Sequence, residues 1–102
     1  MEMTEELEEG TLESRIELLQ RHVEMLKTIR DNQPIGIIKL SEMFNYPRHK
    51  VRYSLRILEE EGLILPTPDG ALVTDRVAEY LDRVKKSLDE TLNMIDELRK
   101  SL

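Results

Sequence analysis

Residues 40–64 read LSEMFNYPRHKVRYSLRILEEEGLI, a pattern that predicts two helices joined by a tight turn and followed by the start of a strand. Asn45 tolerates the left-handed backbone that ends one helix, and Pro47 has its φ angle preset for the first turn of the next. Apolar residues recur at helical spacing on both sides of the turn, so two apolar faces can pack together. These residues are Ile37, Leu40, Met43 and Phe44 before the turn and Val51, Leu55 and Leu58 after it. The stretch therefore predicts a helix-turn-helix unit.

The second of these helices, expected at about residues 47–60, carries a basic surface. The segment RHKVRYSLR at 48–56 contains no acid, and its three arginines form one i, i+4 row. Like charges at this spacing destabilise a helix by about 0.2–0.5 kcal/mol per pair. A merely solvated face is the plain alternative, but such a face more often alternates its charges. The pattern favours contact with DNA phosphates or base edges through Arg48, His49, Lys50, Arg52, Tyr53 and Arg56.

Together with PTPDGALVTDRVAEYL at 66–81, this stretch resembles the winged helix-turn-helix domains of the bacterial and archaeal MarR/ArsR-like transcription regulators. The resemblance covers roughly residues 33–81. It is most specific from Val51 to Ile64, where a recognition helix ends in acids and is followed by Gly62 and an apolar strand. It departs at Pro47, where such families usually carry a Ser or Thr cap, and at Asn45, which replaces a common Gly. The missing hydroxyl removes one typical phosphate contact.

The resemblance implies a mainly α fold with a small β-hairpin wing, and a sequence-specific transcription regulator that binds double-stranded DNA with its recognition helix in the major groove. From the apolar stripes of the long N- and C-terminal helices, described below, we expect these helices to form a dimer interface and the regulator to act as a homodimer. A winged-helix module that binds protein without contacting DNA is the alternative, because one fold can serve either purpose.

Composition limits the class of protein. The 102 residues have room for one domain with extensions. There is no Cys, so disulfides and thiolate metal sites are excluded, and no apolar run approaches the roughly 20 residues that cross a bilayer. The chain starts with acidic residues where a secretory signal would be basic. We therefore expect a soluble, cytoplasmic protein without a membrane partner.

The net charge of −6 argues at first against nucleic acid as a partner. Its distribution along the chain changes this interpretation. Residues 1–13 hold six Glu and no Lys or Arg, which leaves 15 acids and 15 bases in the other 89 residues. Residues 33–58 hold five bases and one acid. The positive charge is therefore concentrated around the expected recognition helix.

The chain before the helix-turn-helix unit is expected to contain an acidic disordered tail at residues 1–10 and then a long helix. The helix should begin at a Thr11 cap, end at Asp31 or Asn32 before Pro34, and lead into a short edge strand at residues 34–36. It is about twice as long as a winged helix needs, so its first turns should pack outside the domain core. Its heptad seam consists of Leu12, Ile16, Leu19, Val23 and Leu26.

The chain after the recognition helix predicts a wing. Residues 63–65 and 71–73 should pair as strands around a turn at Asp69-Gly70. Thr67, Asp69 and Gly70 would lie at its tip. The segment lacks Lys and Arg until Arg76, whereas wings that grip the minor groove often carry a base. A hairpin that merely completes the core, without contacting DNA, is an equally good interpretation. The winged helix-turn-helix domain, with its long first helix, is expected to span residues 11–81.

A final helix is expected from a cap at Thr74 or Asp75 to the C-terminus, so that residues 75–102 form a dimerisation helix. Its apolar stripe is too long for this small domain to cover, which favours a homodimer over an intramolecular hairpin of the two long helices. The residues expected in the dimer interface are Leu12, Ile16, Leu19, Leu81, Val84, Leu88, Leu92, Ile95 and Leu98.

The sequence offers few residues for an enzyme or a metal site. There is no Cys and no Gly-rich phosphate loop, and His22 and His49 occur without a second ligand nearby. We expect no catalytic activity, no cofactor and no metal, and the sequence leaves open whether a small-molecule effector is bound. His22 is interpreted as a surface or rim residue, and Met25 and Met43 as core residues.

Overall fold

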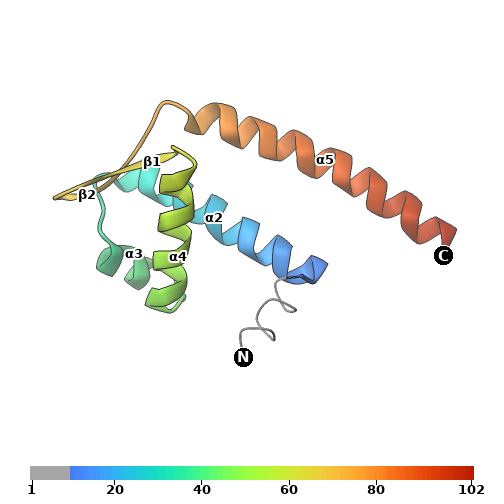
Figure 1. Cartoon of the computed structure of the whole chain (residues 1–102), viewed down its shortest axis with the longest axis horizontal. Helices are drawn as coiled ribbons and strands as arrows, with labels where there is room; N and C mark the ends of the chain where they lie inside the picture. Colours follow the sequence, from blue (N-terminus) through green and yellow to red (C-terminus); the bar gives the residue numbers. More distant parts are fainter. Residues whose placement is uncertain (1–9) are drawn as a thin grey trace.

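The computed structural model describes residues 10–102 and is mainly helical with one small β-hairpin (Figure 1), as the sequence predicts. The predicted acidic tail, apart from Gly10, lies outside the described residues. The elements are α2 (Leu12–Asn32), α3 (Ile37–Met43), α4 (Arg48–Glu60), β1 (Ile64–Thr67), β2 (Gly70–Val73) and α5 (Val77–Ser101). The order helix, helix-turn-helix, hairpin, helix is that of a winged-helix-like fold.

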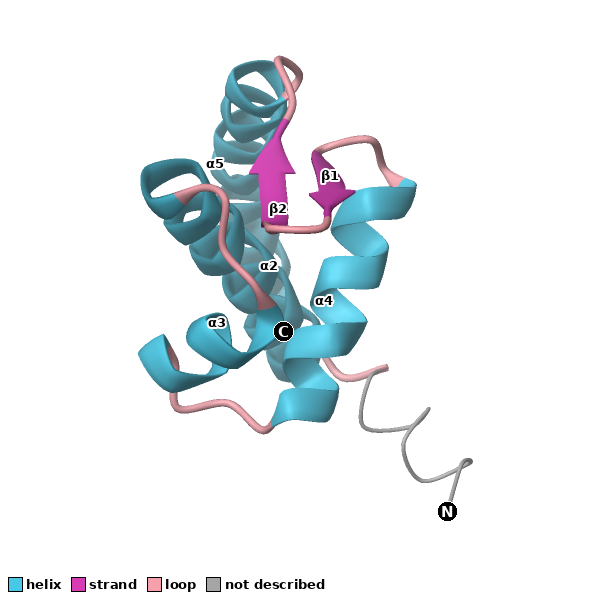
Figure 2. Cartoon of the chain, turned by 90° about the vertical axis from the view of Figure 1, so that its left-hand side faces the viewer, coloured by secondary structure: helices cyan, strands magenta, loops and turns pink. Residues whose placement is uncertain are grey.

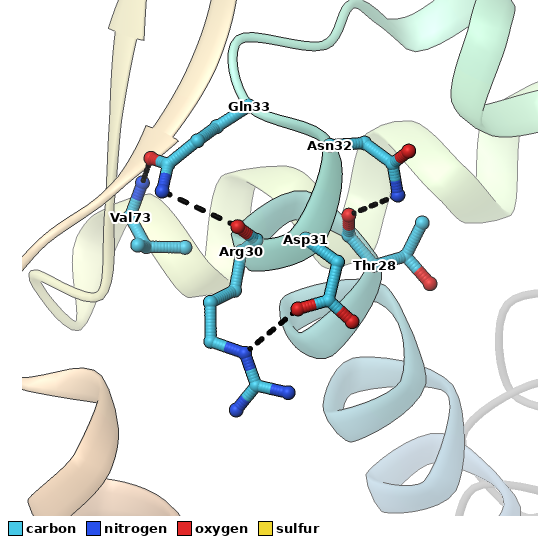
Figure 3. A network of polar contacts seen from close by, with 6 residues as sticks. All are labelled: Thr28, Arg30, Asp31, Asn32, Gln33 and Val73. Carbon is cyan, nitrogen blue, oxygen red and sulfur yellow. Dashed lines mark hydrogen bonds and ion pairs between the residues drawn. The ribbon is translucent and has the colours of Figure 1, made fainter.

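Helix α2 begins as predicted, because the hydroxyl of Thr11 accepts a hydrogen bond from the backbone N–H of Ser14 at 3.1 Å. At its other end, Gln33 ties the helix to the hairpin (Figure 3). The Gln33 side-chain oxygen accepts from the backbone N–H of Val73 at 2.9 Å, and its amide nitrogen donates to the carbonyl of Arg30 at 3.3 Å. One side chain thus fixes where α2 ends relative to β2.

The core lies where the second half of α2 meets the helix-turn-helix unit and the hairpin. Its buried apolar residues are Met25, Leu26 and Ile29 of α2 with Ile35, Leu40, Val51, Leu58, Leu63, Ile64 and Val77. Met25 is fully buried, as predicted for a core residue. Met43, also predicted as a core residue, is the last residue of α3 and is 48% exposed, so it does not belong to the core. Leu40 and Phe44 take the core-facing positions instead.

The turn between α3 and α4 differs in detail from the prediction. The described residues have positive φ angles only at glycines, so Asn45 does not adopt a left-handed conformation. Phe44 ends α3 in an extended conformation, with its N–H donating to the carbonyl of Leu40. Pro47 is also extended and caps α4, whose first helical residue is Arg48. Extended residues therefore flank this turn on both sides.

The hairpin is formed as predicted but turns one residue earlier. Strands β1 and β2 are antiparallel, with Thr67 opposite Gly70, so Pro68 and Asp69 form the turn rather than Asp69-Gly70. Gly70 instead allows a close approach to Ile35, because a Cβ added there would lie 2.6 Å from the Ile35 carbonyl carbon. Ile35 and Ala71 exchange two backbone hydrogen bonds, so the edge strand predicted at residues 34–36 is a single bridge.

Helix α5 begins at Val77, later than predicted, and Arg76 caps it without a side-chain hydrogen bond. The hydroxyl of Thr74, a predicted cap, accepts from the N–H of Arg76 at 3.3 Å and donates to the carbonyl of Gly62 at 2.7 Å, which ties the start of the hairpin to its end. Only the first turns of α5 pack on the core, through Val77, Tyr80 and Leu81. The helix then extends away from the rest of the domain (Figure 1). No helix in residues 10–102 has both the length and the apolarity needed to span a membrane.

Candidate nucleic-acid interface

Helix α4 presents a basic face to solvent. Val51, Ser54 and Leu58 are buried on one side of the helix. At about 100° per residue, the opposite side is centred near His49 and Arg56. The start of α4 lies at the end of the domain away from the hairpin (Figure 2). Five of the six residues that the sequence assigns to DNA binding are exposed, namely Arg48, His49, Lys50, Arg52 and Arg56.

The charges of α4 run against the helix dipole. The first turn carries no acid and the last turn no base, and residues 59–61 are all Glu. The dipole favours the opposite arrangement by typically 0.3–1 kcal/mol per charge. Within residues 10–102, no ion pair includes a side chain of α4. The positive charges at the start of this helix therefore weaken the helix and are not neutralised within the domain.

Tyr53, the sixth residue of the predicted set, is half-buried. Its ring stacks on that of His22 from α2, with a centroid distance of 6.3 Å and an interplanar angle of 29°. The guanidinium carbon of Arg56 lies 5.3 Å from the centroid of the same ring. Tyr53 therefore contacts both the domain interior and the basic face.

His22 is buried, with 8% of its surface exposed, and the prediction of a surface or rim residue is wrong. Its Nδ1 lies 2.9 Å from the hydroxyl of Ser54 on α4, and this hydroxyl also accepts from Nε of Arg21 at 2.9 Å. Burial, and secondarily the positive charge of Arg21, lowers the pKa of His22 below its ordinary value of 6.5. Sequence reasoning overlooked Arg21 and Ser54. The only signal was a Ser among the apolar positions of the helix at residues 48–60.

A second polar contact joins α2 to the turn before α4. The hydroxyl of Tyr46 donates to Oε1 of Glu24 at 3.2 Å, and the guanidinium of Arg21 lies 5.7 Å from the centre of the Tyr46 ring. Desolvation raises the pKa of Tyr46 above 10.0, and the negative charge of Glu24 and its hydrogen bond add to this. Together with the Ser54 contacts, this holds the start of α4 against α2.

The wing offers no positive charge. The side chain of Thr67 faces its own turn, accepting from the N–H of Asp69 at 3.2 Å and donating to the carbonyl of Gly70 at 2.6 Å. Asp69 is exposed at the tip, and the strands ILPT and GALV contain neither Lys nor Arg. The three predicted wing residues thus lie together at the hairpin turn. Thr67 stabilises the turn through its hydroxyl, and Gly70 allows the close approach to Ile35.

The residues predicted for the dimer interface leave an apolar surface exposed on both long helices. On α5, Leu81 and Val84 are half-buried, whereas Leu92 and Leu98 are 66% and 59% exposed. Leu88 and Ile95 lie on the same stripe and are also exposed. At the start of α2, Leu19 is half-buried, and a shallow hollow is lined by Leu12, Glu13, Ile16 and Glu17.

Metal-ligand clusters are missing from the described part of the chain, where no three His, Asp or Glu side chains are placed to hold an ion together. His49, one of the two histidines, is exposed on α4 among the arginines.

Comparisons with known proteins support the fold alone. No protein-family model matches the sequence, and no curated protein matches it. Among solved structures, the chain is similar to the activation domain of the phage T4 transcription factor MotA. The two share 16% sequence identity with a TM-score of 0.53, over 70% of this chain and 78% of the other. The chain therefore has the fold of a domain found in a transcription factor.

Proposed function

We propose that the protein is a DNA-binding transcription regulator that acts as a homodimer and places α4 in the major groove. The observation that carries this proposal is the exposed basic face at the start of α4, where four Arg or Lys side chains have no acidic partner within the described chain. DNA phosphates would supply the missing negative charge. The resemblance to MarR/ArsR-like regulators supports the same function.

The division of labour follows from position on the helix. Residues near the start of a recognition helix usually reach base edges, whereas phosphate contacts orient the protein without reading sequence. By their positions in the sequence, His49, Lys50 and Tyr53 are assigned mainly to base edges and Arg48 and Arg56 to phosphates, with Arg52 able to serve either role. The acids at residues 59–61 would be repelled by phosphates, which favours a helix that enters the groove by its first turns.

The exposed stripe of α5 supports a homodimer. Leu88, Leu92, Ile95 and Leu98 would otherwise face water along much of the helix. The apolar start of α2 can join the same interface. Two recognition helices related by a two-fold axis would require inverted half-sites about 10–10.5 base pairs apart, or a multiple of this spacing.

Selection of bound sequences from a random DNA pool, followed by titration at several salt concentrations, tests the function. We expect log K to fall linearly with log salt, by about 0.9 per phosphate contacted. The variant R48Q/R52Q/R56Q should lose this binding. The control R83Q/K86Q/K100Q removes the same charge from exposed positions of α5 and should keep it. Absence of binding by the parent protein at low salt would refute the proposal.

A second function, docking of a protein partner through the same fold, is favoured by two observations. The wing carries no base, and the chain has a net charge of −6. The MotA chain of similar fold is also described as an activation domain. A stable dimer that fails to bind any duplex at low salt would favour this function over DNA binding.

A further inference from the structure

The contact between Tyr53 and Arg56 assigns a role to a residue that the sequence pattern places among the DNA contacts. We infer that Tyr53 is a positioning residue, which orients the Arg56 guanidinium so that it can contact a DNA phosphate. His22, which stacks on the Tyr53 ring, holds that ring in place. This inference rests on the proposed DNA-binding function and specifies how one part of its site works.

The aromatic ring of Tyr53 packs against the guanidinium of Arg56. Its guanidinium carbon lies 5.3 Å from the centroid of the Tyr53 ring, within the range of a cation–π contact. A guanidinium over a ring keeps its N–H groups available at its edges, where they can donate two parallel hydrogen bonds to a phosphate. Arg56 is exposed and forms no ion pair within residues 10–102. Restricting this long side chain before binding lowers the entropy cost of its contact with DNA.

The Tyr53 ring is in turn held in place by a residue of α2. Tyr53 is half-buried and stacks on His22, whose ring is fixed in turn by the hydroxyl of Ser54. Ser54 is fully buried and also accepts from Arg21. The side chains therefore form a series of contacts in the order Arg21, Ser54, His22, Tyr53 and Arg56. The ring of Tyr53 is engaged within the protein, which leaves the task of base reading to His49 and Lys50.

The experiment is a double-mutant cycle in DNA affinity between Tyr53 and Arg56, measured on a random-sequence duplex at several salt concentrations. Tyr53→Leu should weaken binding by about 2- to 5-fold per recognition helix, the change expected from an exposed cation–π contact. Tyr53→Phe keeps the ring and should bind like the parent protein. In an Arg56→Ala background, Tyr53→Leu should have no further effect, because the side chain that it positions is missing.

Tyr80→Leu is the matched control, since Tyr80 is also half-buried but packs at the start of α5. It should change neither the affinity nor the salt slope. Equal effects of Tyr53→Leu with and without Arg56 would overturn the inference, as would a weaker affinity of Tyr53→Phe, which would make the hydroxyl a DNA contact. If the parent protein binds no DNA, the proposed function fails and the inference fails with it.

A measurement on the parent protein without DNA covers the case in which Tyr53→Leu does not fold. Protons of the Arg56 side chain that lie over the Tyr53 ring should show upfield ring-current shifts in NMR spectra, and Tyr53→Phe should retain them. Ordinary shifts for these protons in both proteins would overturn the inference.

Discussion

The Nδ1 atom of His22 lies 2.9 Å from the hydroxyl oxygen of Ser54, and this contact joins the long helix α2 to α4. The same hydroxyl accepts from Nε of Arg21, so its own hydrogen is available to Nδ1. A neutral imidazole with an unprotonated Nδ1 can accept this hydrogen. Protonation of the neutral ring to an imidazolium would place a second positive charge beside Arg21, inside the domain.

The stability of the protein should therefore depend on pH through His22. Burial lowers the pKa of His22 below 6.5 in the folded state, so the unfolded chain takes up the proton first as the pH falls. The free energy of unfolding should be highest above pH 6.5 and decrease as the pH falls from 6.5 through the folded pKa. Urea unfolding between pH 7.5 and 5 measures this slope. His22→Gln should reduce this slope, because it removes the titrating group.

Replacing Ser54 should cost more than its size suggests. Ser54→Ala leaves the ring nitrogen of His22 and Nε of Arg21 without their shared partner. A buried polar group left unsatisfied costs about 1–3 kcal/mol, and we expect the free energy of unfolding to fall by that amount. Denaturant unfolding checks the value. Ser87→Ala, at an exposed position of α5, should be close to neutral, and an equal effect of the two substitutions would contradict the role of Ser54.

Gly70→Ala should destabilise the protein by about 1–3 kcal/mol, because the residue has a φ angle of +127° and a Cβ would lie 2.6 Å from the backbone of Ile35. Gly36→Ala is the matched control, since its Cβ would meet nothing within 4 Å. We expect a change within about 1 kcal/mol at Gly36, which caps α3. Thermal unfolding of both variants measures the difference, and similar melting temperatures would show that the hairpin can move away from Ile35.

Leu88→Glu should break the proposed dimer by placing a charge in the apolar stripe of α5. Light scattering should give about twice the chain mass for the parent protein and once the chain mass for the variant. Leu65→Glu, at an exposed apolar position of β1, should stay dimeric. A monomeric parent protein would remove the basis for this interface.

Arg56 and Lys50 should differ in how their replacement affects DNA binding. Arg56→Ala should weaken binding to all duplexes about equally and lower the salt slope by about 1 for each phosphate that the arginine would otherwise neutralise. Lys50→Ala should cost about 1–3 kcal/mol, chiefly on the preferred site. Titrations on specific and random duplexes separate the two effects. An unchanged affinity and salt slope for Arg56→Ala would mean that its side of α4 does not face DNA.

The sequence by itself determined the helices, the hairpin and the positive charge of α4. The bounds of α2 follow from Thr11 and Pro34, and the basic segment at 48–56 can be recognised without a structure. The hairpin follows from two short apolar runs around Asp69-Gly70. These are local properties, because caps, turns and helical periodicity depend on residues a few positions apart.

Only the tertiary structure decided which residues of these helices and strands are buried. The heptad spacing of α2 is the same along its length, yet Leu26 is buried and Leu12 is exposed, because the buried residues of the helix lie between His22 and Ile29, where it meets α4 and the hairpin. The burial of His22 depends on Ser54, 32 residues away, and the need for Gly70 depends on Ile35. Contacts between residues so distant in the chain leave no periodic signal in the sequence. Each partner fits the helix or turn pattern of its own segment, and that pattern depends only on residues a few positions away.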